Sequence, residues 1–423
     1  MNTPFTSATF SSVWQKHFSR ERSLTTEQLF SGLLFVKQRG LPLYTNMGST
    51  QTKGIFYELR EVEPVDFSNK VFRIFDVPSY FQVNTKTQNL NRLGLYKVKQ
   101  YPGFLIDLTG YNDLNAYMQA SFSKSSRYKL NKYKKRLEQA FDIRYEMYFG
   151  NLEKELYDTI FTRFKELLEK RFDEKQERNN NLDPDEWAFY YEVAYPMILE
   201  KKAGLFVVYQ GDTPVAITLN YLSDIVLFDA ITVFDIDYSK FHLGSVSVMG
   251  LIEWCLENSI TTLDFSKGYF EYKKRWASRQ YDFEYHIYFD KGSAGSRLLA
   301  FALKQFYRFK DYLRRNQVNL LFHKIAYRVQ KAKIPQAALP KFEFSKTESN
   351  YPEERLKYID LSLPENAFLK PVLFEYLYLY TAHIDEVQLF KILDEPNACL
   401  ISGPMESVIA KVDGSKIKVQ CLF

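Results

Sequence analysis

Three β-rich, mainly apolar runs separated by short polar turns occupy residues 204–234, and this pattern predicts three consecutive strands. The segments GLFVVYQ, PVAITLNYL and IVLFDAITVF are rich in β-branched and aromatic residues, and the short turns GDT and SD separate them. Connections this short join antiparallel neighbours, because parallel strands need a crossover of about a dozen residues or more. We therefore expect an antiparallel meander in this part of the chain.

A loop, a helix and two further strands are expected after the meander. The loop DYSKFHLG precedes SVSVMGLIEWCLEN, which we predict as a helix, and the strand-like segments TTLDF and DFEYHIYF follow. The stretch LDFSKGYFEYKKRW, residues 263–276, ends the first of these strands and leads to the second. Its acid, glycine, aromatic rings and four basic residues fit a charged surface turn and the polar end of a binding site equally well.

Helical periodicity dominates the region before the meander. Residues 111–140 predict a helix with a break near 121–126, and residues 151–172 and 185–202 predict two more. A basic amphipathic helical region is expected over 291–334.

The two ends of the chain combine helical and strand-like patterns. Residues 25–40 open with a capping-box-like TTEQ and predict a helix or a helix leading into a strand. Residues 54–62 and 70–77 alternate like strands, whereas 366–383 predict a helix with an internal Pro371, and 406–423 a hairpin. The fold class is therefore mixed α+β.

Turn segments and a Pro-containing segment between these patterns divide the chain into five parts. They are an N-terminal part (1–110), a central domain (111–290), the basic helical region (291–334), a Pro-containing linker (335–351) and a small C-terminal α+β unit (352–423). A length of 423 residues fits two or three domains of roughly 150 residues.

Composition and charge exclude several classes of protein. The net charge of +5 permits anionic ligands but is too small to indicate nucleic-acid binding. The cysteines Cys255, Cys399 and Cys421 have no metal-ligand or disulfide spacing, and the five histidines have no Cys or Ser partner at a motif spacing. No metal site is therefore expected. The N-terminus lacks the pattern of a signal peptide, and no run approaches roughly 18 apolar residues, so a cytoplasmic protein is expected.

The clearest candidate for anion binding is the start of the helix after the meander. Gly244 precedes Ser245 and Ser247, and the free N–H groups and dipole of a first helical turn suit a phosphate. Gly244 would let a ligand approach the backbone closely, because it has no β-carbon. The alternative is a Gly/Ser cap that only begins the helix.

Two arginines lie on otherwise apolar helical stripes. Arg127 precedes the stripe of Leu130 and Leu137, and Arg171 extends the stripe that ends at Leu168. An arginine in such a position extends to solvent, pairs with a buried acid or faces a ligand cavity. Both are therefore candidates for substrate binding, with solvent exposure at a helix end as the alternative.

Four residues could carry proton transfer or charge stabilisation. Asp264 ends a predicted strand, and Tyr272 and Lys273 lie just beyond it. A lysine can stabilise developing negative charge, and a tyrosine can donate a proton to a leaving group. Asp229 lies in the middle of a predicted strand and is either a buried acid or a residue on the exposed face of the sheet.

These segments together resemble the GNAT acyltransferase superfamily, in particular its CelD-type (cellulose-biosynthesis acetyltransferase-like) branch, which is related to the Fem peptidoglycan aminoacyltransferases. The similar segments are SSRYKLNKYKKRLE, LLEKRF, GLFVVYQGDTPVAITLNYL, HLGSVSVMGLIEW and, most closely, LDFSKGYFEYKKRW. The similarity covers roughly residues 105–290, is weaker towards the N-terminus, and does not extend beyond about 335.

The resemblance implies two coupled GNAT-like units with a shared cleft that binds an acyl donor. It implies that Gly244 and Ser245 bind the pyrophosphate of the donor, that Lys273 stabilises the transition state or binds substrate, and that Arg127 and Arg171 face the shared cleft. The residue patterns described above add Ser247 to the donor contacts, Tyr272 and Asp264 to the catalytic candidates, and Asp229 to the candidates for substrate binding. The loop 240–246 has one glycine, whereas the superfamily pattern has Gly, one spacer, then Gly or Ala. The donor could accordingly be acyl-CoA or an acyl carrier protein.

The implied function is acyl transfer to an amine or hydroxyl of a cell-envelope precursor, sugar or lipid, with no metal. An aminoacyl-tRNA-dependent transferase of the Fem type is one alternative, and tRNA would be a partner only in that case. A non-catalytic scaffold on a degenerate GNAT fold, in peripheral contact with the inner membrane through 297–333, is the other.

Overall fold

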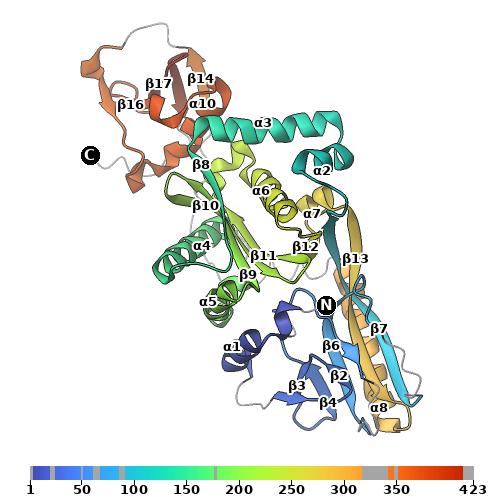
Figure 1. The fold of residues 1–423 in the computed structure, drawn as a ribbon. Helices are drawn as coiled ribbons and strands as arrows, with labels where there is room; N and C mark the ends of the chain where they lie inside the picture. The colour runs from blue at the N-terminus through green and yellow to red at the C-terminus, as the bar shows by residue number, and fades with distance from the viewer. Residues whose placement is uncertain are drawn as a thin grey trace.

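One mixed β-sheet of eleven strands runs through the computed structural model (Figure 1), which describes residues 3–19, 24–48, 51–60, 67–84, 91–175, 179–316, 342–346 and 351–412. The strands follow one another across the sheet in the order β1-β3-β4-β6-β13-β7-β12-β11-β10-β9-β8. Their bounds are β1 Leu24–Thr26, β3 Leu34–Lys37, β4 Leu43–Asn46, β6 Val71–Pro78, β7 Leu93–Asp107, β8 Ile143–Tyr148, β9 Ala203–Gln210, β10 Thr213–Leu222, β11 Val226–Phe234, β12 Thr262–Lys267 and β13 Arg279–Asp290.

Two pairs of neighbouring strands in this sheet are parallel, and the other pairs are antiparallel. β4 runs parallel to β6 in the N-terminal half, and β11 runs parallel to β12 in the other half. Antiparallel strands flank each parallel pair on both sides. The strand pattern therefore occurs twice, as expected for two coupled units, and the mixed α+β class is confirmed.

The long strand β7 joins the two halves of the sheet. It lies between β13, with which it pairs from Leu93 to Leu105, and β12, with which it pairs from Gly103 to Asp107. A strand from the N-terminal part is thus inserted between two strands of the predicted central domain. Since main-chain hydrogen bonds continue across the junction, we expect the two halves to move together.

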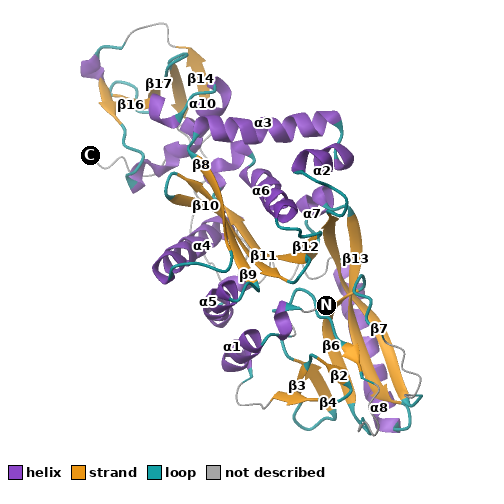
Figure 2. Cartoon of the chain, viewed as in Figure 1, coloured by secondary structure: helices purple, strands orange, loops and turns teal. Residues whose placement is uncertain are grey.

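Helices cover both faces of the sheet (Figure 2). On one side α1, α4 and α5 share a core with the strands, and on the other side α2, α3 and α6 share a second core. The helix α8 packs against β7 and β13. The bounds are α1 Ala8–Phe18, α2 Leu114–Ser121, α3 Lys124–Ala140, α4 Lys154–Lys175, α5 Pro184–Leu199, α6 Leu243–Glu257, α7 Glu271–Trp276 and α8 Ala294–Arg315.

The C-terminal unit has a five-stranded antiparallel sheet of its own, in the order β14-β18-β17-β16-β15, and one helix, α10. Through α10 it packs on α3 and on the short helix η3. Its bounds are β14 Phe342–Lys346, β15 Leu356–Tyr358, β16 Gln388–Ile392, β17 Ala398–Ser402, β18 Val408–Val412 and α10 Lys370–Tyr380. The remaining elements are β2 Phe30–Ser31, β5 Glu58–Leu59, η1 Pro4–Thr6, η2 Asn180–Leu182, η3 Ile236–Phe241, η4 Glu353–Arg355, η5 Pro364–Leu369 and η6 Ile384–Glu386.

Most of the predicted elements are confirmed. β9, β10 and β11 form the antiparallel meander, and α6, β12 and β13 follow in the predicted order. The predicted helix break is also present, because α2 ends at Ser121 and Ser123 caps α3 by accepting a hydrogen bond from the N–H of Ser126.

The helix predicted within residues 25–40 is wrong. This segment forms β1, β2 and β3, with a turn at Gly32, whose φ is 79°. Phe30 and Phe35 pack edge-on against Phe72 of β6. Tertiary packing against β6 therefore favours strands over the helix that the local pattern predicts.

Three expectations near the C-terminus also change. Pro371 lies in the first turn of α10, where its missing N–H costs no hydrogen bond, and not inside the helix. Residues 342–346, assigned to the linker, form β14 and pair with β18. The predicted helical residues 317–334, the second arm of the hairpin and Cys421 lie outside the described residues. Within the described part of the chain, no helix is both long and apolar enough to cross a membrane.

Candidate active site

The candidate site lies where two parallel strands separate. β11 and β12 pair only from Val226 to Phe228 and from Thr262 to Asp264, after which β11 continues without β12 beside it. The pairing of β11 with β10 shifts at Leu219/Asn220, and that of β12 with β7 shifts between Asp264 and Lys267. Beyond β12 the chain forms the short helix α7, which lies between α6 and the start of β13 (Figure 1). This opening between the strands is called the wedge below.

Lys273 is anchored at the wedge by the irregular end of β12. The residue is 6% exposed, and its Nζ donates to the carbonyl oxygens of Phe265 (2.6 Å) and Lys267 (3.1 Å). Ser266, between these two carbonyls, has a φ of 62°. Burial lowers the pKa of Lys273 to about 8, although the carboxylates of Asp229 and Asp264 oppose the change. A buried ammonium group can strongly stabilise a negative charge that develops beside it during a reaction.

Asp229 is a buried acid, so its alternative assignment to the exposed face of the sheet is wrong. The residue is 8% exposed, and its Oδ1 accepts a 2.6 Å hydrogen bond from the hydroxyl of Thr232. Burial raises the pKa of Asp229, whereas the Thr232 hydroxyl and the charges of Lys273 and Lys53 oppose the rise. A carboxylate with a raised pKa next to a lysine can accept a proton during catalysis.

Asp264 is completely buried and is held by tyrosines. Its carboxylate accepts hydrogen bonds from the hydroxyls of Tyr80 (2.8 Å) and Tyr281 (2.6 Å) and from the N–H of Ser266 (2.7 Å). Burial raises the pKa of Asp264 to about 6 despite these bonds and the charge of Lys273. With its oxygens already satisfied, Asp264 has the contacts of a residue that positions the end of β12 and compensates the charge of Lys273.

The N-terminal half contributes a lysine that the sequence analysis missed. Burial lowers the pKa of Lys53 to about 8, and the charges of Lys267, Asp76, Lys273 and Asp229 act on it as well. No motif surrounds Lys53, and only the fold brings it to the wedge, more than 200 positions before Lys273 along the chain. Thr52 and Gly54 give no local signal either.

Lys267 links the same region to β6 and is not an ordinary surface residue. Its Nζ donates to Oδ1 of the buried Asp76 (2.8 Å), whose Oδ2 accepts from the hydroxyl of Thr52 (2.9 Å). Asp76 therefore connects the segment that carries Lys53 to the end of β12. This ion pair and the Tyr80–Asp264 hydrogen bond are direct polar contacts between the two halves at the wedge.

Two buried polar atoms near the wedge have no hydrogen-bond partner among the described residues. They are Oδ1 of Asn220, which is opposite Asp229 in the β10–β11 register, and Oγ of Ser266, next to the carbonyls that hold Lys273. Buried polar atoms are nearly always paired with protein, water or ligand. Their position fits a wedge that accepts the polar part of a substrate.

The three residues predicted to bind the donor pyrophosphate lie in the first turns of α6, with different surroundings. Ser245 is partly exposed, whereas Ser247 is 3% exposed and lies inside the second core. A β-carbon on Gly244 would come within 2.7 Å of the ring of Phe234. Packing against Phe234 is therefore sufficient to explain the glycine. The N–H groups of Ser245 and Val246 donate to the carbonyl oxygen of His242 (2.8 and 3.2 Å). Those of Leu243 and Gly244, at the very start of α6, have no partner within the helix.

Basic groups surround this helix start. The guanidinium of Arg171 lies 4.4 Å from the ring centroid of Phe234, the ring that packs on Gly244. Burial lowers the pKa of His242, the residue before α6, and the charges of Arg275 and Lys240 lower it further. Burial also lowers the pKa of Arg171, while Tyr272 opposes that change. The arrangement suits an anionic group of a donor.

Tyr272 lies at the outer side of the wedge and is 40% exposed. Desolvation raises the pKa of its phenol, the charge of Asp229 raises it further, and that of Arg171 opposes the rise. Its ring contacts Phe265 edge-on, with 5.8 Å between the centroids. The structure thus brings Asp229, Tyr272, Lys273 and Arg171 together at one opening.

Arg127 is not part of this group of residues. Its Nη1 donates to the carbonyl oxygens of Phe122 (2.8 Å) and Gln119 (3.2 Å) at the end of α2. Arginine near a helix C-terminus satisfies carbonyls that lack partners within the helix. The described contacts give Arg127 a role at the α2–α3 junction and none at the wedge.

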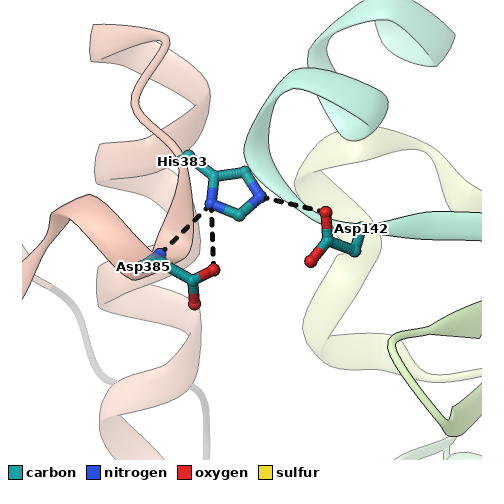
Figure 3. Close-up of side chains that lie close together, drawn as sticks. All are labelled: Asp142, His383 and Asp385. Atoms are coloured by element: carbon teal, nitrogen blue, oxygen red, sulfur yellow. Dashed lines mark hydrogen bonds and ion pairs between the residues drawn. The ribbon is translucent and has the colours of Figure 1, made fainter.

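A second group of ionisable residues lies between α3 and the C-terminal unit (Figure 3). His383 Nε2 is 3.6 Å from Asp142, and His383 Nδ1 is 3.4 Å from Asp385 and accepts from the N–H of the same residue. Both carboxylates are 78% exposed. Because His383 already caps η6, we interpret the group as a contact between the two parts of the chain. A hollow of about 460 Å³ nearby is lined by Tyr133, Lys240, His242 and Tyr378 among others.

Residues 124–274, which contain α3 to α7, match the family model described as an acetyltransferase (GNAT) domain. The chain contains a GNAT domain. The predicted GNAT-like fold is thereby confirmed, with the wedge between β11 and β12 inside the matched segment. No curated protein sequence matches the chain significantly.

The GNAT domain and its neighbouring strands are also similar to several solved structures. A conserved protein of unknown function from Bacteroides thetaiotaomicron is 11% identical, with a TM-score of 0.43 over 68% of this chain and 90% of that one. L-PGS from Bacillus licheniformis is 10% identical, with a TM-score of 0.41 over 71% and 96%. FemX is 12% identical, with a TM-score of 0.40 over 60% and 83%. These values are too low to transfer function to this chain.

The packing of Gly244 predicts an unusual response to Gly244→Ala. Alanine in place of glycine within a helix normally stabilises by about 1 kcal/mol. Here the new β-carbon meets Phe234, so we expect a loss of about 1–3 kcal/mol, measured by urea unfolding. Ser245→Ala, one position later in the same turn, is the matched control and should change little. A stabilised Gly244→Ala variant would show that the glycine is not required for packing.

The burial of Asp264 predicts a specific pH dependence of stability. Its folded pKa of about 6 lies above the unfolded value, so its ionisation lowers the free energy of unfolding as the pH rises from 4 to 7, by up to about 3 kcal/mol. Asp264→Asn removes this loss. The stability of the variant relative to wild type should therefore increase over that pH range in chemical denaturation. Asp224→Asn, at an exposed position, is the control; parallel curves for wild type and Asp264→Asn would contradict the prediction.

Proposed function

We propose that the wedge transfers an acyl group from a thioester donor to an amine or hydroxyl of an envelope precursor, sugar or lipid. The observation that carries the proposal is the buried ammonium of Lys273 beside the buried carboxylate of Asp229, at the strand separation of a GNAT domain. A cation and a potential base at one opening are what acyl transfer by direct attack requires.

The proposed reaction has one attacking and one leaving group. The nitrogen or oxygen of the acceptor attacks the thioester carbonyl carbon and loses its proton to Asp229. Lys273 stabilises the negative charge that develops on the carbonyl oxygen. The C–S bond then breaks, the thiolate takes a proton from the hydroxyl of Tyr272, and the products are an amide or ester and a free thiol.

The donor is proposed to approach along α6. The N–H groups of Leu243 and Gly244 and the hydroxyl of Ser245, together with Arg171, would bind its phosphate groups, since a helix start and nearby cations favour an anion. Acyl-CoA and acyl carrier protein both carry a phosphate followed by a long thiol arm, and either fits this chemistry. Placement within the CelD-type branch, and the aminoacyl-tRNA donor of Fem transferases, stay predictions that a donor comparison will decide.

Removal of the Lys273 ammonium tests the proposed mechanism. Lys273→Ala should lower kcat by about a hundred- to a thousandfold, the effect of one electrostatic group, with acetyl-CoA, a long-chain acyl-CoA or an acyl carrier protein as donor. Lys274→Ala is the matched control, because Lys274 is exposed and its ion pair among the described residues is with Glu271 on α7. Equal turnover in wild type and Lys273→Ala would remove Lys273 from the mechanism. Turnover with charged tRNA alone would replace the thioester donor.

The activity should also decrease at alkaline pH. Lys273 must be protonated to stabilise an oxyanion, and burial lowers the pKa of Lys273 to about 8, so kcat/KM should fall above that pH. In Lys273→Arg the group stays charged, and the alkaline decrease should disappear from the residual activity. Because burial also lowers the pKa of Lys53 to about 8, Lys53→Arg is the necessary comparison. An alkaline decrease that persists in Lys273→Arg and disappears in Lys53→Arg would assign the titration to Lys53 and contradict the prediction.

A further inference from the structure

The helix α8 has apolar residues on two opposite faces. Its inner face packs on the sheet, where Tyr307 stacks on Tyr285 (3.8 Å between centroids) and Arg314 Nη1 donates to the carbonyl oxygen of Gln100 (2.7 Å). Its outer face exposes a row of large side chains at helical spacing. They are Leu298 (71% exposed), Phe301 (47%), Phe306 (58%), Phe309 (59%) and Tyr312 (63%).

This outer row is the largest concentration of exposed apolar side chains on any described element. Isolated exposed apolar residues are normal, whereas a contiguous row on one helix face indicates a surface that another body covers. Positions 298, 301, 309 and 312 lie within about 80° of one another around the helix, at 100° per residue. In the described chain no other segment contacts this face.

The charges on α8 indicate what covers it. The helix has six basic residues and one acid, Asp311, which pairs with Arg315. Arg297, Arg308 and Arg315 are exposed and lie along one edge of the apolar row, so the surface is apolar with a cationic border. A second copy of this chain in a two-fold arrangement would bring equal charges together, which disfavours self-association through this face. An anionic lipid surface matches both the apolar row and the cations.

We propose that α8 is a docking surface for anionic membranes, with Leu298, Phe301, Phe309 and Tyr312 at the acyl-chain boundary and Arg297 and Arg308 at the headgroups. The helix would lie in the plane of the interface, because its inner face stays packed on β7 and β13 (Figure 1). The proposal does not depend on catalysis.

The orientation of α8 has a consequence that does rest on the proposed function. The C-terminal end of α8 lies beside the part of β7 that leads to the wedge, because Arg314 Nη1 donates to the carbonyl oxygen of Gln100 and Gly103, three residues further along β7, pairs with Lys267 of β12. Lys267 is the residue that pairs with Asp76 beside the wedge. Docking through α8 would therefore hold the wedge close to the membrane, where an acceptor with a lipid chain is accessible.

Vesicle flotation of the full chain tests the docking surface. Wild type should float with phosphatidylcholine vesicles that contain phosphatidylglycerol, and much less with phosphatidylcholine alone or in high salt. A variant with Leu298→Ser, Phe301→Ser, Phe309→Ser and Tyr312→Ser, and another with Arg297→Gln and Arg308→Gln, should each partition at least about tenfold less. Their unfolding midpoints should equal that of wild type, since the replaced side chains are exposed.

A matched control on α3 separates specific docking from attraction by any basic helix. Tyr128, Lys129 and Lys135 of α3 are also exposed. A variant with Tyr128→Ser, Lys129→Gln and Lys135→Gln should float like wild type. The proposal is overturned if wild type binds neither vesicle, if the α8 variants float unchanged, or if the α3 variant loses as much binding. It is also overturned if wild type is a dimer that the α8 variants dissociate.

Discussion

The burial of the Lys273 ammonium is the constraint on which the candidate site depends. Its two main-chain acceptors, the carbonyls of Phe265 and Lys267, lie on either side of the positive-φ residue Ser266, so the lysine and the irregular end of β12 stabilise each other. Two buried acids, Asp229 and Asp264, compensate its charge from β11 and β12. A buried charge without such partners would shift its pKa further or disrupt the fold. The charge of Lys273 is therefore compensated within the wedge.

The candidate site belongs to both halves of the sheet. β7 places the N-terminal half beside β12, and the Lys267–Asp76 pair brings the segment of Lys53 to the wedge. Two lysines with lowered pKa values then act on the same carboxylate, Asp229. Perturbed groups concentrated in this way are typical of functional sites. The GNAT domain alone would lack Lys53 and Asp76.

The sequence predicted those elements whose structure is determined by a local pattern of residues. The meander, the helix after it and the break between α2 and α3 follow from periodicity, turn residues and caps within short windows. Residues 25–40 were assigned wrongly because Phe30 and Phe35 are ordered by Phe72, a contact that no short window contains. Lys53 had no motif, since only pairing across more than 200 residues brings it to Lys273.

The residues of the candidate site also differ in whether local sequence pattern or distant contacts determine their position. Tyr272 and Lys273 were identified because they lie just beyond a recognisable strand end, and Asp229 because it is an acid in the middle of a predicted strand. The structure brings the three together. Arg127 had an equally good pattern, yet it bonds to the end of α2. A stripe on a helix specifies the side of the helix but not the partner that the side meets.

The position of a bound donor analogue tests the central claim most directly. A crystal structure with a thioether or ketone analogue of acyl-CoA, in which the scissile bond cannot break, would locate the carbonyl or its replacement. We expect this group in the wedge, within hydrogen-bond distance of Lys273 Nζ, with the phosphates at the start of α6 near Arg171. An analogue bound only in the hollow lined by Tyr133, Lys240, His242 and Tyr378, with the wedge unchanged, would show that the wedge is not the active site.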